Sequence, residues 1–259
     1  MGYTEITYDE HGHVGLVTIN RPEARNALTY TTYAELEDAV RTTEARCLII
    51  TGADPAFCSG DDVKQILSKT GDAPTGDREP LKPRLTPAAD ALLHTNVPII
   101  AAVNGAAVGW GMELALMADI RIASENAKFG ELFVKRGINC DAPGLGRLAQ
   151  LVGRETAAEL LFTGRIISGE EAARLRLVSR VVPHGELMHE AMILAHEIAN
   201  NPPLAVQRLK EGLRRTLDPD WHELGAWVTQ SLIELFQTKD HREGVASFLE
   251  KRAPVFTGE

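Results

Sequence analysis

The sequence has little of what several protein classes require. Its three cysteines are odd in number and form no C-x-x-C pair, which argues against a disulfide framework and against a zinc site. No run of Lys or Arg exceeds two residues and the formal net charge is −9, so we expect no nucleic-acid partner. No apolar run approaches the length of a membrane span, and the first residues are too polar for a signal peptide. We therefore expect no membrane partner and a cytoplasmic location.

The chain does have the apolar content of a large globular core. At 259 residues and 44% apolar residues, it can bury one full core. Short β-rich runs alternate with helical patterns, and strand, helix, strand order indicates an α/β fold with a parallel sheet. We predict strands over 14–20, 47–52, 98–105 and 119–124.

Two further stretches have distinct patterns. Residues 71–87 carry four prolines and many charges, which is typical of a surface loop. After residue 150 the pattern is helical throughout, with Ser168 and Glu171 in the spacing of a capping box. Helices gathered at one end of the chain indicate a helical oligomerisation region attached to an α/β core.

A carboxylate stands inside the apolar run "GAAVGWGMELALMAD". Gly105, Gly109 and Gly111 allow a tight turn out of the preceding strand, and a helix is predicted to begin at about Trp110. The first N–H groups of a helix have no internal partner and can bind a developing oxyanion. Glu113 then lies in the first turn as a candidate acid or base, since burial raises the pKa of a carboxyl group. The alternative is that Glu113 complements the helix dipole or pairs with Arg121.

The run "PAFCSGDDVKQI" repeats this strand, turn, helix arrangement around Ser59 and Gly60, with a helix predicted to start near Asp61. Its alternative interpretation is ordinary N-capping by Asp61 or Asp62. Two such turns from neighbouring parallel strands can together aim two backbone donors at one carbonyl oxygen.

Five segments in the same order resemble the crotonase superfamily of enoyl-CoA hydratases and isomerases. They cover essentially the whole chain: "NRPEARNAL", "AFCSGDDV", "VNGAAVGWGMELALMADIRIAS", "AKFGE" and "TKDHREGVASFLEKR". The resemblance implies a crotonase-like spiral of ββα units over residues 1–195. It also implies a C-terminal helical region over 196–259 that forms homotrimers or hexamers and part of the coenzyme A site.

The same resemblance implies a substrate and its contacts. The substrate would be an acyl-CoA thioester, coenzyme A being part of the substrate, with no further cofactor and no metal. The backbone N–H groups of Asp61 and Trp110 would form the oxyanion hole. Residues predicted to bind coenzyme A are Ala24, Arg25, Asp62, Val63 and Lys251. An arginine suits a phosphate group, although Arg25 as a solvated loop residue is the alternative.

One departure from the family pattern bears on mechanism. A hydratase resembling this chain uses two glutamates; the first matches Glu113, but the second falls at Phe133. Asp141 matches instead an aspartate that several members other than hydratases use as base or nucleophile. Two carboxyl groups, Glu113 and Asp141, suit removal and return of a proton, so isomerisation of an unsaturated acyl-CoA is the favoured function.

Three alternatives stay open. Asp141 could replace the missing glutamate in a hydratase, or the chain could keep the fold without chemistry. Asp141 could also be no more than a helix N-cap before Pro143.

Overall fold

The computed structural model describes residues 2–63, 66 and 84–259, and the predicted loop over 71–87 therefore lies mostly outside the described residues. A six-stranded sheet forms the larger layer, in the order β1-β2-β3-β5-β7-β10. Its strands are β1 (Ile6–His11), β2 (Val14–Ile19), β3 (Cys47–Gly52), β5 (Ile99–Val103), β7 (Ile120–Ser124) and β10 (Arg180–Val182). All neighbours except the β1-β2 hairpin pair in parallel, so the four predicted strands and the parallel sheet are confirmed.

A second sheet of short strands lies beside the first. Its order is β4-β6-β8-β9, from β4 (Ala56–Cys58), β6 (Ala106–Val108), β8 (Lys128–Gly130) and β9 (Ile167–Ser168). The long strands β3, β5 and β7 are each followed by a short strand, β4, β6 and β8, and these neighbour one another in the same sequence. The chain thus repeats one turn of long strand, short strand and helical segment, which confirms the predicted spiral.

Helices cover both faces of the larger sheet. The helices are α1 (Tyr30–Thr42), α2 (Pro87–His94), α3 (Trp110–Met117), α4 (Ala142–Val152), α5 (Arg154–Thr163), α6 (Gly169–Arg174), α7 (Leu187–Ala199), α8 (Pro203–Leu217), α9 (Trp221–Leu235) and α10 (Lys239–Leu249). Single 3-10 turns are η1 (Pro22–Ala24), η3 (Phe133–Arg136) and η4 (His184–Glu186). Ser168 caps α6 through the N–H of Glu171, as predicted.

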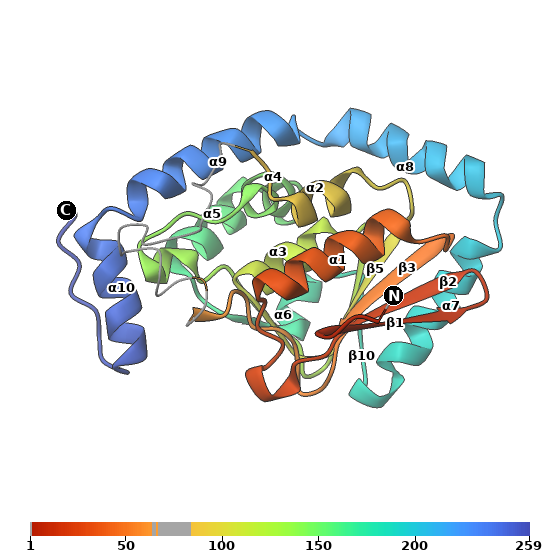
Figure 1. Cartoon of the computed structure of the whole chain (residues 1–259), viewed down its shortest axis with the longest axis horizontal. Helices are drawn as coiled ribbons and strands as arrows, with labels where there is room; N and C mark the ends of the chain where they lie inside the picture. Colours follow the sequence, from red (N-terminus) through yellow and green to blue (C-terminus); the bar gives the residue numbers. More distant parts are fainter. Residues whose placement is uncertain (1, 64–65, 67–83) are drawn as a thin grey trace.

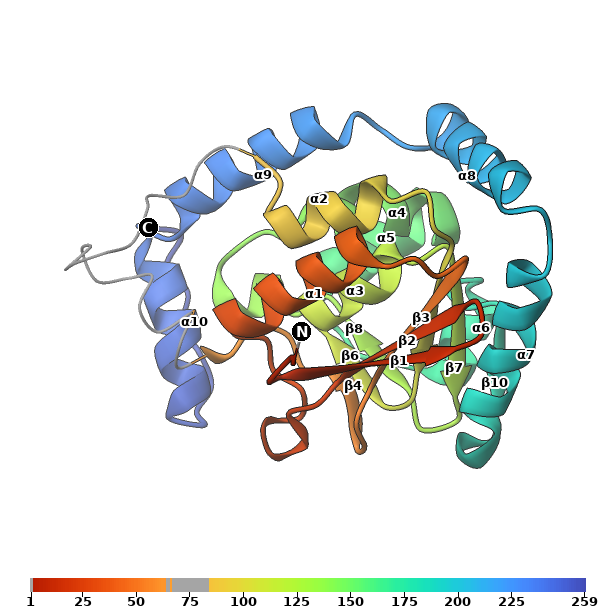
Figure 2. The same ribbon diagram turned by 45° about the vertical axis from the view of Figure 1, so that its right-hand side comes forward.

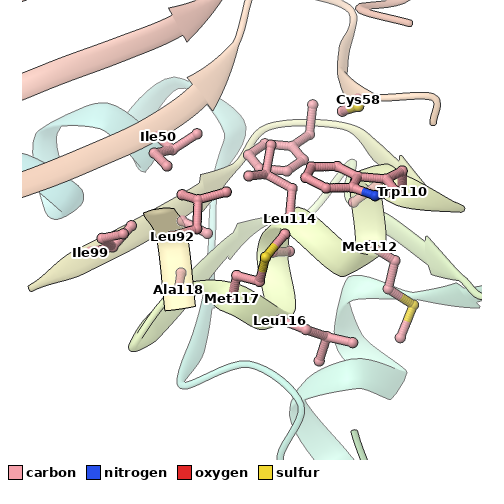
Figure 3. Packing of buried hydrophobic residues seen from close by; sticks show 14 of the residues in the cluster. Ile50, Cys58, Leu92, Ile99, Trp110, Met112, Leu114, Leu116, Met117 and Ala118 are labelled. Carbon is pink, nitrogen blue, oxygen red and sulfur yellow. The ribbon is translucent and has the colours of Figure 1, made fainter. Parts of the chain in front are cut away.

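Helix α3 is the most enclosed of these elements. All eight of its residues are buried, and Figure 3 shows its apolar side chains extending to several sides among residues from other elements. The strands explain this enclosure, since β3 and β5 are apolar and buried along their whole length. Helix α7 packs on the opposite face through small residues such as Ala191 and Ala195.

The prediction that the chain is helical throughout after residue 150 is wrong at two places. Strand β9 pairs antiparallel with β8, and β10 adds a parallel edge strand beside β7. These strands are two and three residues long, too short for periodicity in the sequence to reveal them.

Helices α8, α9 and α10 form an arc around the outside of the core (Figures 1 and 2). Lys210 on α8 anchors the arc, because its Nζ donates to Asp119 at 2.7 Å and to the carbonyl of Val97 at 2.8 Å. Helix α7 runs through the predicted boundary at 195/196, and the division into 1–195 and 196–259 stays a prediction. Within the part of the chain described, no helix combines the length and apolar character needed to cross a membrane.

Candidate active site

Two glycine turns lie against each other where β4 and β6 end. The two strands pair in parallel, so the turns that follow them meet at one edge of the sheet. Gly60 and Gly109 both have positive φ, +87° and +54°. A Cβ on Gly60 would lie 2.9 Å from the carbonyl oxygen of Val108 and 3.3 Å from the nitrogen of Trp110, so only glycine fits this contact.

The backbone N–H groups of Asp61 and Trp110 are not used by the backbone hydrogen bonds around these two turns. Asp61 forms a parallel bridge with Leu28, in which Leu28 N donates to Gly60 O and Asp62 N donates to Leu28 O, both at 2.9 Å. That pairing uses the residues on either side of Asp61 and not its own N–H. Trp110 is the first residue of α3, where an N–H has no intrahelical acceptor. Two donors at adjoining turns suit the polarisation of one carbonyl oxygen.

Glu113 is fully buried in α3 and held by backbone donors. Its Oε1 accepts from the N–H of Asp141 at 3.0 Å, and its Oε2 accepts from the N–H of Gly144 at 2.7 Å. The alternative pairing with Arg121 is wrong, because that guanidinium donates to backbone carbonyls instead. Burial, followed by the neighbouring carboxyl groups of Glu131 and Asp141, raises the pKa of Glu113 well above its usual value.

Asp141 precedes α4, but its side chain does not cap that helix. Burial and the nearby Asp61 raise the pKa of Asp141 to about 7, although a hydrogen bond with the Trp110 side chain acts in the opposite direction. A carboxyl group with such a pKa can exchange a proton near neutral pH. The structure thus brings Asp141 to the same turns as the two backbone donors.

Asp61 adds a carboxyl group beside its own N–H. It accepts a hydrogen bond from the hydroxyl of Tyr33 at 2.5 Å, and burial raises its pKa to about 6. The ring of Tyr33 in turn packs edge-on against Trp110, with the centroids 4.6 Å apart.

Glu131 is the residue that the sequence analysis missed. It is 1% exposed, and neither carboxylate oxygen has a hydrogen-bond partner among the described residues. Its carboxyl oxygen, a carboxyl oxygen of Glu113 and the sulfur of Cys140 all lie within 4.8 Å of one another. Burial and Asp141 raise the pKa of Glu131 well above its usual value. The available signal was a single acidic residue at the end of "AKFGE", two positions before Phe133.

A cavity of about 600 Å³ opens beside Glu131. Its wall is mainly apolar, with side chains from η3, α4, α5, α9 and the C-terminal segment. These include Phe133, Val134, Ile138, Leu145, Leu161, Leu235 and Phe256. Such a wall suits an acyl chain. Phe133, at the position of the missing glutamate, therefore contributes apolar surface.

The predicted coenzyme A residues divide into two groups. Ser59 donates through its N–H to the carbonyl of Arg25 at 3.1 Å and through its hydroxyl to that of Ala24 at 3.3 Å, which fixes both beside the first glycine turn. Asp62 and Val63 directly follow that turn, and Asp62 lies 3.5 Å from the guanidinium of Arg21. The Arg25 side chain is exposed.

Lys251 stands apart from this group in the chain and in its contacts. It follows α10, which packs against η3, and its side chain is exposed. The roles of all five residues in binding coenzyme A stay predictions.

Comparison with known proteins agrees with this geometry. The sequence model of the enoyl-CoA hydratase/isomerase family matches residues 9–259. The chain is 37% identical to a protein of Mycobacterium bovis named a probable enoyl-CoA hydratase, over 99% of both chains. An enoyl-CoA hydratase/isomerase structure from Pseudoalteromonas atlantica superposes with a TM-score of 0.88 at 28% identity, covering 98% of this chain and 100% of that one.

A third similar protein is named for isomerisation alone. The structure of a monofunctional enoyl CoA isomerase from M. smegmatis superposes with a TM-score of 0.69 at 30% identity, over 86% of this chain and 98% of that one. The chain belongs to the enoyl-CoA hydratase/isomerase family, within the crotonase superfamily. It is accordingly an enzyme of the hydratase/isomerase type.

The close packing around Glu113 generates a first prediction. A Cβ on Gly144 would lie 2.6 Å from Oε1 of Glu113 and 2.9 Å from the sulfur of Cys140, so Gly144→Ala should destabilise the fold by about 1–3 kcal/mol. Gly212→Ala on α8 is the matched control, because nothing lies within 4 Å of its Cβ and alanine favours a helix by about 1 kcal/mol. Urea denaturation measures both. An unchanged midpoint for Gly144→Ala would contradict the packing described.

The raised pKa of Asp141 generates a second prediction. Because its pKa is about 7 when folded and near 3.8 when unfolded, the folded state binds the proton more tightly, and stability falls as pH rises towards 7. Asp141→Asn removes this loss of stability, because asparagine does not ionise. The thermal midpoint of the variant, relative to the unchanged protein, should therefore be higher at pH 8 than at pH 5.

The control is Asp240→Asn, since backbone N–H groups lower the pKa of Asp240 below its usual value. Both pH values lie above that pKa, so the effect of Asp240→Asn should be the same at pH 5 and pH 8. Equal effects of Asp141→Asn at the two pH values would mean that Asp141 titrates as it does in water.

Proposed function

We propose that this enzyme isomerises an unsaturated acyl-CoA thioester by moving a proton along the acyl chain. The observation that carries the proposal is the meeting of two backbone donors with two buried carboxyl groups. The N–H groups of Asp61 and Trp110 lie at adjoining turns, and Asp141 hydrogen-bonds with the side chain of Trp110. Glu113 accepts the backbone N–H of Asp141, so both carboxyl groups belong to one site.

The chemistry follows from where charge develops. Removing a proton from the carbon beside a thioester places negative charge on the thioester oxygen, and two fixed N–H donors stabilise that charge. One of Asp141 and Glu113 takes this proton and the other returns a proton further along the chain. Carboxyl groups with raised pKa values suit both tasks at neutral pH. The reaction needs no cofactor beyond the coenzyme A of the substrate itself.

Coenzyme A would lie along the first glycine turn. Ala24, Arg25, Asp62 and Val63 surround that turn, and the exposed guanidinium of Arg25 can reach a phosphate group. Lys251 lies in the C-terminal segment and would contact coenzyme A from there.

We further propose a homotrimer or a hexamer for the assembly. The support is a row of exposed leucines along α8, with Leu204, Leu209, Leu213 and Leu217 all more than half exposed in the single chain. The cytoplasmic location stays a prediction.

Hydration is the second candidate, because the relative from Mycobacterium bovis is named a hydratase. In this reaction Asp141 would replace the glutamate absent at Phe133. The two reactions differ in their products, since hydration adds one water to a 2-enoyl-CoA and isomerisation adds none.

The third prediction tests this choice with a panel of 2-enoyl-, 3-enoyl- and dienoyl-CoA thioesters in deuterated water, followed by mass spectrometry. We expect double-bond migration with deuterium uptake and without a gain of water. Asp141→Asn should lower the rate by about 100-fold or more, because general acid–base catalysis contributes about 10²- to 10⁴-fold. Asp9→Asn, an exposed residue on β1, is the control and should leave the rate unchanged.

Two results would overturn the proposal. Gain of one water on the 2-enoyl-CoA would assign hydration. If the thioesters bind but none of them reacts, the chain would be a member of the fold that lacks this chemistry.

A further inference from the structure

Glu131 has surroundings that no purely structural role explains. An ionised carboxylate in an apolar site costs a large free energy unless it is hydrogen-bonded or paired. Glu131 is 1% exposed, and both of its oxygens lack a partner in the described part of the chain. A carboxyl group in this position therefore favours its protonated form, which is neutral.

The neighbouring Glu113 decides which of the two carries the proton. The two carboxyl groups have oxygens within 4.8 Å of each other, so they do not readily ionise together. Glu113 accepts N–H donors on both oxygens, from Asp141 and Gly144, and these bonds stabilise its ionised form. Glu131 has no such donor among the residues described. This difference in hydrogen bonding favours Glu131 as the carrier of the one proton of the pair.

Glu131 also lies on the side of the site where an acyl chain would extend. It lines the cavity together with Phe133, Ile138 and Leu145. Asp141, by contrast, is bound to the side chain of Trp110 at the glycine turns and lies near Asp61. The thioester end of a substrate would meet Asp141, and the carbons beyond it would meet Glu131.

We propose that Glu131 is the catalytic acid that protonates the acyl chain at the far end of the migrating double bond. The inference rests on the proposed function and assigns its second proton transfer to Glu131 in place of Glu113. It makes Glu131 the member of the Glu113/Glu131 pair that contacts substrate, and Glu113 the positioning residue that keeps the proton on its neighbour. Glu131 thereby supplies an acid two residues before the position where Phe133 stands.

With a 3-enoyl thioester, two proton transfers move the double bond. Asp141 takes a proton from the carbon next to the thioester, and the electron pair of that C–H bond forms the new double bond. The electron pair of the old double bond forms a C–H bond with the proton of Glu131. Asp141 ends protonated and Glu131 ionised, and transfer of one proton from Asp141 to Glu131 restores both.

The fourth prediction concerns Glu131→Gln, which has the size of a protonated glutamate but no acidic proton. In deuterated water, we expect the variant to exchange deuterium at the carbon beside the thioester while double-bond migration falls by about 100-fold or more. Asp141→Asn should lose both exchange and migration. Glu44→Gln, at an exposed site outside the cavity, is the control and should retain both.

Several results would overturn the inference. If Glu131→Gln moves the double bond at the rate of the parent enzyme, Glu131 is excluded as the acid. Loss of deuterium exchange together with migration, in a variant whose circular dichroism is unchanged, would assign Glu131 a positioning role. Inactivation of the parent enzyme by a chelator, reversed by Zn²⁺, would assign Glu113, Glu131 and Cys140 to a metal.

The proposed function can be judged separately in the same assay. If the parent enzyme migrates no double bond, the proposed function fails and the inference fails with it. If the parent enzyme is active and Glu131→Gln equals it, only the inference fails.

Discussion

The parallel pairing of β4 with β6 is the constraint on which the site depends. It brings two glycine turns into contact, and at these turns the N–H groups of Asp61 and Trp110 are not used by the neighbouring backbone hydrogen bonds. The same pairing places the start of α3 there, so that Glu113 follows one helical turn later within a fully buried helix. A side chain on Gly60 would separate the turns and with them the two donors.

Four acidic side chains gather around this junction at a cost to stability. Burial raises the pKa values of Asp61, Glu113, Glu131 and Asp141, so their ionised forms destabilise the fold. The chain offsets this cost unevenly, with backbone donors to Glu113 and the Tyr33 hydroxyl to Asp61. Glu131 receives no such compensation in the described structure. An uneven arrangement of this kind separates the proton affinities of neighbouring carboxyl groups, which is what an acid and a base in one site require.

The sequence predicted the parts of this arrangement that have local signals. Apolar runs marked the long strands, and glycines before an apolar helix marked the turn at Trp110 and the position of Glu113. Glu131 escaped prediction because only burial distinguishes it from an exposed acidic residue, and burial depends on residues distant in the chain. Likewise the pairing of Leu28 with Asp61 and the two short strands β9 and β10 form through tertiary contacts.

Infrared difference spectroscopy can detect the proton on Glu131, because a protonated carboxylic acid and a carboxylate absorb at different frequencies. We expect a protonated-acid band at neutral pH that loses intensity in Glu131→Gln and keeps its full intensity in Glu44→Gln. Absence of that band from the parent protein, or its persistence in Glu131→Gln at full intensity, would contradict the assignment of a shared proton to Glu131.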